Sequence, residues 1–207
     1  QTDWFKNQVR LRLIATIERA SGGHVEIGKF SYDWRALTAG VDHFVLHGTE
    51  PANSPALFTA DRLSVQLKLI SVFRKKIDVA SVIVERPHIF LLVRPDGSTN
   101  IPSPKIRTAR TKTVPEQIVD LAIRHFELRQ GWIAYQEQQW PLDLRGENLN
   151  ADIRYDVLTP RYLGTLSSRQ LHIKSGISLP AAADPETRFI FEKDRLNFEQ
   201  LTLASSH

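Results

Sequence analysis

The stretch ERPHIFLLVRPDGSTNIP, residues 85–102, decides the fold of this chain. It joins two extended apolar runs through Pro87 and then breaks at Asp96-Gly97, a dipeptide typical of tight turns. Its five consecutive apolar residues, 89–93, predict a strand buried on both faces. Upstream, residues 63–69 alternate strictly between apolar and polar, which is the period of a strand with one buried face. The stretch predicts a sheet-building unit without catalytic chemistry.

The start of the chain has a helical period. Between residues 4 and 20, apolar residues recur at intervals of four: Phe5, Val9, Leu13 and Ile17. This stripe predicts an N-terminal amphipathic helix, and Gly22-Gly23 supplies the positive φ that ends it. A basic helix of this kind can lie on a membrane surface, but packing against the sheet is the favoured reading.

From His24 onward the period changes from 3.6 to 2, which indicates strands. The predicted strands are 24–32, 38–47, 57–69, 77–86, 88–94, 124–130, 132–136, 141–155, 162–174, 187–192 and 195–204. Turns are predicted at 48–54, 96–97, 130–131 and 180–185. We expect these strands to form an antiparallel meander.

Two irregularities divide the pattern. Residues 115–123 fit one short internal helix that begins at Pro115, and they follow a Pro-, Lys-, Arg- and Thr-rich stretch. We therefore expect one unit at 1–104, the helix with the first part of the sheet, and a second at 105–207, the short helix with the continuing sheet. In 141–155 the apolar parity changes, so a bulge is predicted near 146–148, with a similar slip between Phe198 and Leu201.

Composition and motifs argue against several functions. Hydrophobic residues make up 42% and charged residues 24% of the 207 residues, as in ordinary globular proteins. The net charge of +4 comes from scattered Lys and Arg residues, so nucleic-acid binding is not predicted. Cysteine is absent, which excludes disulfides and thiolate chemistry. Nucleophile-elbow, phosphate-loop, dinucleotide and zinc-protease motifs are also missing, so we expect no enzyme, no catalytic residue and no cofactor.

The histidines give no metal site. In a strand, the spacing of His43 and His47 places the two residues about 13 Å apart at ~3.3 Å per residue, too far to share one ion. The other histidines lack ligand spacing. We expect no metal.

Several short motifs occur in a characteristic order. They are SGGHVEIG at 21–28, HGTEP at 47–51, the alternating strand 63–69, ERP at 85–87 and DGSTNIP at 96–102, followed more loosely by LRGENL at 144–149 and RYLG at 161–164. Together they resemble the N-terminal part of the AsmA-like and TamB family of bacterial envelope proteins. The match covers residues 1 to 104 well and continues loosely beyond them.

This resemblance implies a mainly β fold: an elongated, twisted antiparallel sheet forming a taco-like groove. The implied location is the periplasm, with an inner-membrane anchor expected before residue 1. The chain lacks an initiating Met, and we expect it to be part of a longer protein whose sheet continues at the C-terminal end. The implied function is phospholipid movement between the inner and outer membranes. The alternative is a scaffold for outer-membrane protein translocation and assembly, with an outer-membrane β-barrel assembly protein as partner.

The candidate lipid-binding residues are the apolar positions of the groove floor. They are Leu63, Val65, Leu67, Leu69, Ile77, Val79, Leu142, Leu144, Ile153, Phe189 and Phe191. Period 2 identifies which face of a strand is dry but not what covers it. The pattern alone favours a packed core over an open groove, whereas the resemblance favours the groove.

Overall fold

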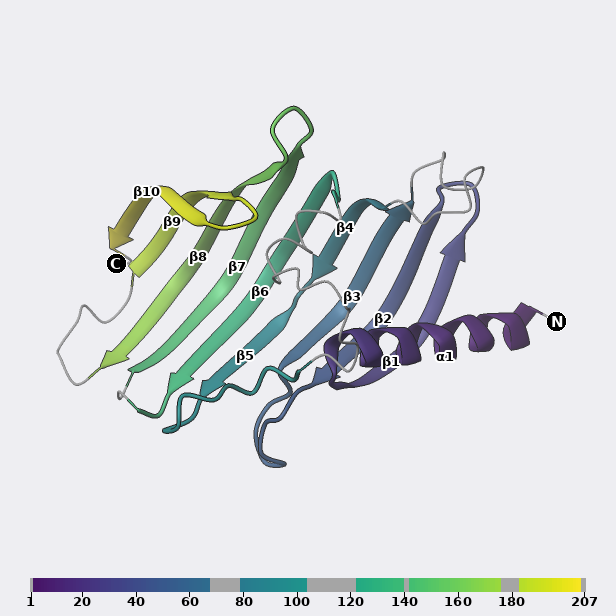
Figure 1. Ribbon diagram of the computed structural model, residues 1–207, viewed down its shortest axis with the longest axis horizontal. Coiled ribbons are helices and arrows are strands. Elements are labelled where there is room, and N and C mark those ends of the chain that lie inside the picture. Colours follow the sequence, from purple (N-terminus) through teal and green to yellow (C-terminus); the bar gives the residue numbers. More distant parts are fainter. Residues whose placement is uncertain (1, 68–78, 104–121, 140–141, 176–182, 206–207) are drawn as a thin grey trace.

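The protein is mainly β, with one helix and one ten-stranded sheet (Figure 1). The computed structural model describes residues 2–67, 79–103, 122–139, 142–175 and 183–205. The elements are α1 (Thr2–Ser21), β1 (His24–Asp33), β2 (Thr38–His47), β3 (Phe58–Leu67), β4 (Val79–Glu85), β5 (His88–Val93), β6 (His125–Glu137), β7 (Leu142–Asp156), β8 (Arg161–Ser175), β9 (Ala183–Phe191) and β10 (Leu196–Ser205).

The strand order is β1-β2-β3-β4-β6-β7-β8-β9-β10, and β5 pairs with β3 and β6. Because β4 and β5 share these two neighbours, they form one line of strand interrupted at Arg86-Pro87. Both pair with β6 in parallel, so the prediction of an antiparallel meander is wrong at this step. The connection 94–124 between β5 and β6 is long enough for the crossover that parallel pairing requires. The remaining pairs are antiparallel.

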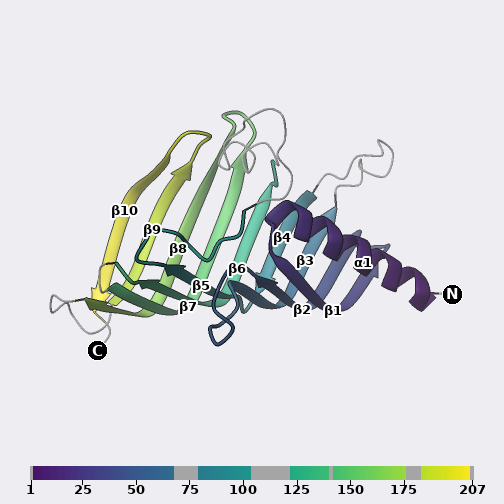
Figure 2. The ribbon, with the colours of Figure 1, turned by 60° about the horizontal axis from the view of Figure 1, so that its bottom comes forward.

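The helix α1 lies on one face of the sheet over its first strands (Figures 1 and 2). Leu13, Ile14 and Ile17 pack against a cluster of side chains from β1 and β2, so Leu13 and Ile17 make the contact that the stripe predicts. Trp4 and Leu11 are exposed. The helix ends at Ser21, and the next residue, Gly22, has a φ of 81°. The side chain of Phe5 lies outside the described residues. No helix in the described part of the chain combines the length and apolarity of a membrane span.

We call the face that carries α1 the inner face and the opposite one the outer face. On β1 the inner cluster contains both Ile27 and Phe30, and on β2 it contains both Val41 and Phe44. A spacing of three would put such residues on opposite faces of a regular strand. Each strand therefore changes phase once, and the two polar or small residues at the change both point outward.

The phase changes form a line across the sheet, which we call the crease. Five residues on it have positive φ, between 46° and 53°: His43, Arg86, Gln130, Asn148 and Gln170. Register shifts accompany it in β6, β7 and β8. Bulges bend strands and increase their twist, and Figure 2 shows the long strands β7 and β8 bent along their length.

Two of the predicted irregularities are confirmed. The bulge at 146–148 coincides with register shifts around Glu147, and the slip near Phe198 coincides with a shift between Phe198 and Gln200. The predicted turn at 130–131 is wrong, because residues 125–137 form one continuous strand, β6, with a bulge there. The amide N–H of Gln130 that leaves the ladder donates to Oδ1 of Asn150 at 3.0 Å. The side chain of Asn150 thus takes the place of the backbone acceptor that Gln130 lacks at the bulge.

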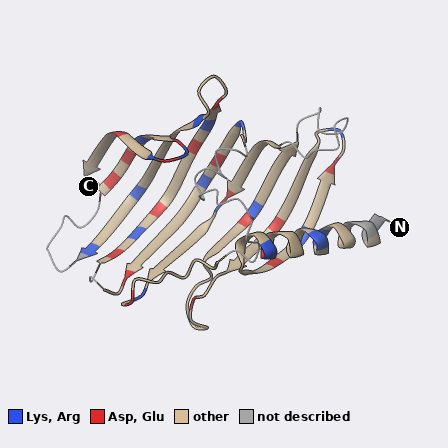
Figure 3. Cartoon of the chain, viewed as in Figure 1, with Lys and Arg blue, Asp and Glu red and all other residues tan. Residues whose placement is uncertain are grey.

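Charged residues of alternating sign cross the outer face beside the crease. Lys29 pairs with Asp42, Asp42 with Arg62, Arg62 with Glu85 and Glu85 with Arg129. We call these five residues the charge row. Opposite charges on neighbouring strands stabilise a sheet, and the Arg62 guanidinium donates to Asp42 at 2.9 Å. Figure 3 shows acidic and basic positions of the strands lying beside one another.

The turn at Asp96-Gly97 is confirmed. Gly97 has φ 79° and its N–H donates to the Arg94 carbonyl at 2.9 Å. The chain then returns beside β5, so that Asn100, which is 0% exposed, reaches the loop after β2, where Thr49 N–H donates to the Asn100 carbonyl at 2.9 Å. The HGTEP and DGSTNIP segments, distant in the sequence, therefore meet.

Two further predictions concern the turn at 180–185 and the short helix at 115–123. β9 begins at Ala183 and includes Pro185, so the predicted turn 180–185 is wrong at its end and the strand begins earlier than 187. Pro185 is tolerated because it lies at the register shift between β8 and β9, where no β8 residue pairs with it. The predicted short helix 115–123 lies outside the described residues, except for 122–123, which are not helical.

Candidate functional site

The nine predicted floor residues that the structure describes lie on four strands of the one sheet. Leu63, Val65 and Leu67 are on β3 and Val79 is on β4, while Leu69 and Ile77 lie outside the described residues. Leu142, Leu144 and Ile153 are on β7, and Phe189 and Phe191 are on β9. All nine described side chains are half-buried. The strand order runs from β1 to β10 without pairing these two ends, so the described sheet is open.

Two apolar clusters lie on the inner face. The first joins β1, β2 and the helix around Val25, which is 2% exposed, and it includes the predicted residue Leu63. The second lies farther along the sheet, around Leu128, Leu149 and Ala151, and it includes Ile153. The helix covers the first cluster. Among the described elements, none covers the second cluster in the same way.

Beyond the second cluster the inner face is hollowed. An apolar depression of about 210 Å³ is lined by Ile123, Phe126, Ile153, Tyr162, Phe189 and Phe191. Three of these residues are in the predicted set. The sequence prediction missed Ile123, Phe126 and Tyr162, although Phe126 has the parity of Leu128 and could have been found from it. We call this depression the inner hollow.

Tyr162 forms one wall of the inner hollow and is 5% exposed. Its hydroxyl oxygen accepts the Ile123 amide N–H at 3.0 Å, and its ring meets Tyr155 edge-on at 5.1 Å between centroids. Burial raises the pKa of the Tyr162 hydroxyl, because the phenolate would lose its hydration. The group is therefore a neutral structural wall at physiological pH.

The position of the Phe189 ring depends on Gly164, the residue opposite Phe189 on the neighbouring strand β8. The two residues pair across β8 and β9, and a Cβ at Gly164 would lie 2.4 Å from the phenyl ring. The aromatic ring thus lies over the bare backbone of the glycine. Any larger residue at Gly164 would displace the ring and reshape the inner hollow.

The apolar face continues to the last strand. On β10, Leu196, Phe198, Leu201 and Leu203 are 50%, 62%, 64% and 62% exposed. They pair across the sheet with Phe191, Phe189, Thr187 and Pro185 of β9. The floor of the inner hollow therefore extends on to a strand whose apolar side chains are open to solvent.

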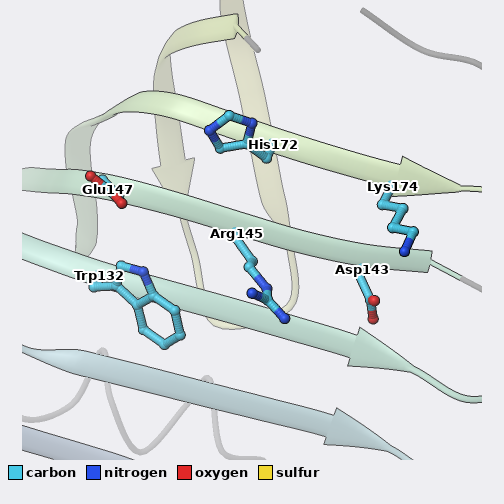
Figure 4. Close-up of a pocket in the computed structure, with 6 residues that line it drawn as sticks. All are labelled: Trp132, Asp143, Arg145, Glu147, His172 and Lys174. Atoms are coloured by element: carbon cyan, nitrogen blue, oxygen red, sulfur yellow. The ribbon is translucent and has the colours of Figure 1, made fainter. Parts of the chain in front are cut away.

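The outer face carries one apolar cluster, Phe90, Leu92 and Ala134 with Trp132, and a depression lined mostly by charged side chains, which we call the outer hollow (Figure 4). It measures about 480 Å³ and is lined by Trp132, Asp143, Arg145, Glu147, His172 and Lys174, which come from β6, β7 and β8. On β7, Asp143 and Arg145 have the parity opposite to that of Leu142 and Leu144, so they point away from the inner face. Lys174 and His172 of β8 pair with them and point the same way. No sequence pattern marked them as a group.

Other titratable groups form ion pairs typical of a sheet surface. Burial of Asp152 opposes its ionisation, but hydrogen bonds from His125 at 3.0 Å and Arg154 at 3.0 Å outweigh it and lower the pKa of the carboxyl. The hydrogen bonds from Arg129 likewise lower the pKa of Glu127. Within the described residues, no group of His, Asp and Glu has the geometry to hold a metal ion.

Comparison with known proteins adds no family assignment. A scan against protein-family models finds no match, and a search of curated proteins finds no similar sequence.

Proposed function

We propose that the inner face is the floor of a lipid-carrying groove. In this proposal the crease curls the sheet into a taco-like shape, acyl chains lie along the floor, and head groups lie at the polar rim. The observation that carries the proposal is the half-exposed apolar surface that runs from β3 to β10 on one face, with the inner hollow in its course. Exposed apolar surfaces of this extent mark binding sites for apolar partners.

The free energy of burying apolar groups suits the movement of an acyl chain along this floor. Each CH₂ group that leaves water contributes ~0.8 kcal/mol wherever it lies on the apolar floor. A chain that slides from one strand to the next exchanges equivalent contacts, so movement needs no catalytic residue. The inner hollow would hold a segment of one acyl chain, since its walls are aromatic and aliphatic.

The helix has a distinct role in this proposal. Its apolar stripe of Leu13, Ile14 and Ile17 closes the inner face over β1 and β2, so one end of the floor is dry without lipid. Lipid would therefore occupy the face beyond the helix, between β3 and β10. The resemblance to the AsmA-like and TamB family supports placement in the periplasm, with an inner-membrane anchor and transport between the two membranes.

The test is photo-crosslinking in cells from a probe at Val65, with the neighbouring outer-face residue Ser64 as the matched control. Val65 pairs with Val82 and Ser64 with Ile83 on the same two strands, so the probes differ in the face they occupy. Phospholipid adducts from position 65 and none from position 64 support the groove. Equal labelling from both positions, or no lipid adduct from position 65, contradicts it.

A scaffold function is the second candidate, and β10 favours it. This strand ends the order of the sheet and presents four exposed apolar side chains. A partner strand, such as one from an outer-membrane assembly protein, could add to its edge. A probe at Leu201 that captures a protein instead of lipid would favour this function.

A further inference from the structure

The outer hollow contains charged side chains without partners. Asp143, Arg145, Glu147 and Lys174 make no side-chain hydrogen bond or ion pair with any described residue. Some charged residues elsewhere on the outer face form ion pairs, as Arg62 does with Asp42 and Arg154 with Asp152. The four groups therefore remain available to a ligand.

The signs of these groups limit the ligand. Asp143 and Glu147 accept hydrogen bonds only, whereas Arg145 and Lys174 donate only. An anion would be repelled by the two carboxylates, and a cation by the guanidinium and the ammonium group. A neutral ligand whose groups both donate and accept satisfies all four, and the hydroxyl group is such a group.

Two aromatic residues in the lining of the outer hollow, Trp132 and His172, limit the ligand further. In Figure 4, which looks on to the broad faces of β6, β7 and β8, the rings of Trp132 and His172 are seen face-on, with Arg145 between them and Lys174. Trp132 packs against the buried cluster of Phe90, Leu92 and Ala134, which lies beside it on the same face of β5 and β6. The indole is thus held as a flat platform on which an apolar C–H surface can stack.

We propose that the outer hollow binds a pyranose residue of a neutral glycan. A pyranose has a C–H face for the indole and a rim of hydroxyl groups for the carboxylates and cations. The volume of about 480 Å³ lies in the range of small-ligand sites, ~300–1,000 Å³. A peptide fits less well, because the hollow lies in the interior of the sheet, where β6, β7 and β8 are paired on both sides and offer no free edge.

This site goes beyond the proposed lipid function and does not depend on it. The outer hollow and the apolar floor lie on opposite faces of the same strands, so each can be changed alone.

The test is an NMR titration of the ¹⁵N-labelled protein, which follows the indole N–H signals of the tryptophans. The probes are cellotetraose, chitotetraose and maltotetraose. For a Kd of ~1 mM, the Trp132 signal should move with saturation below about 10 mM sugar. Arg145→Ala and Glu147→Gln should each weaken binding at least tenfold, and both residues are exposed, so the fold should tolerate the changes.

Trp34→Ala is the matched control, because Trp34 is 74% exposed on the turn between β1 and β2, far along the sheet. This variant should bind sugar as the parent does. If no sugar moves the Trp132 signal at about 10 mM, or if Trp34→Ala weakens binding as much as Arg145→Ala, the proposal is overturned. Binding of a neutral Ser- and Asn-rich peptide without any sugar binding would also overturn it, in favour of a peptide site. Lipid crosslinking from Val65 should be unchanged in Arg145→Ala, which separates this proposal from the groove.

Discussion

The side-chain amide of Asn100 takes the place of a neighbouring strand beside Leu92. Its Oδ1 accepts the Leu92 amide N–H at 2.9 Å, and its Nδ2 donates to the Phe90 carbonyl at 2.8 Å. The backbone N–H of Asn100 donates to the Leu92 carbonyl at 3.0 Å. One fully buried residue thus completes the ladder of β5 where β3 no longer accompanies it.

Replacing Asn100 should therefore destabilise the fold strongly. In Asn100→Ala, two buried backbone groups lose their partners, so the free energy of unfolding should fall by about 2–4 kcal/mol. Denaturant melts followed by circular dichroism measure this change. Ser98→Ala, in the same exposed turn, is the control and should cost less than about 0.5 kcal/mol. A similar small loss for Asn100→Ala would show that water replaces the amide.

The contact of the helix with the sheet can be tested at Leu13. Leu13→Ala removes a half-buried side chain that packs on the first cluster, and we expect a loss of about 1–2 kcal/mol in the free energy of unfolding. Leu11 is 46% exposed on the same helix, so Leu11→Ala should have little effect. If both variants melt alike, the helix does not hold the end of the sheet.

The charge row predicts that reversing the charge of one of its members lowers the free energy of unfolding. Arg62→Glu places a carboxylate opposite both Asp42 and Glu85, and like charges on neighbouring strands are unfavourable. We expect a loss of about 1 kcal/mol in the free energy of unfolding at low salt, and a smaller loss in high salt because of screening. Adding Asp42→Lys should recover part of the loss. A salt-independent loss would assign the effect to packing instead of charge.

Tyr162 predicts the response to alkaline pH. Its pKa is raised in the folded protein, whereas an unfolded tyrosine ionises near pH 10. Above about pH 10 the unfolded chain releases a proton that the folded chain keeps, so this contribution to stability is complete below pH 10 and declines as the pH rises. In Tyr162→Phe the decline should be shallower. Tyr135, whose pKa is raised by its hydrogen bond to Glu137, leaves a residual slope.

Local sequence patterns were sufficient for the strands and for some of their irregularities. The parity change between Leu144 and Leu149 required a bulge, and the structure has one. At Gln130-Gly131 the sequence predicts a turn, whereas the structure has a bulge there, because glycine suits both. The parallel step from β4 and β5 to β6 depends on which strands meet after a long connection, and no local period contains that information.

The candidate sites also depend on strand pairing, which local sequence patterns do not contain. Parity placed Ile153 and Phe189 on a dry face, but the inner hollow also needs Tyr162 and Ile123, which the register of β8 and a hydrogen bond bring there. The outer hollow was not predictable at all. Its Asp143 and Lys174 are opposite each other only because β7 and β8 pair in this register.

The floor of the proposed groove is most directly tested at Phe189. Phe189→Asp places a carboxylate in the inner hollow, where an unpaired ion among apolar groups costs several kcal/mol when lipid excludes water. Ile190 is the matched control, since it is the next residue on β9, is also half-buried and has the opposite parity. We expect phospholipid that co-purifies with the protein, counted by native mass spectrometry, to be lost in Phe189→Asp and kept in Ile190→Asp. Circular dichroism should confirm that both variants are folded. Equal lipid occupancy in the two folded variants would show that acyl chains do not lie over β9.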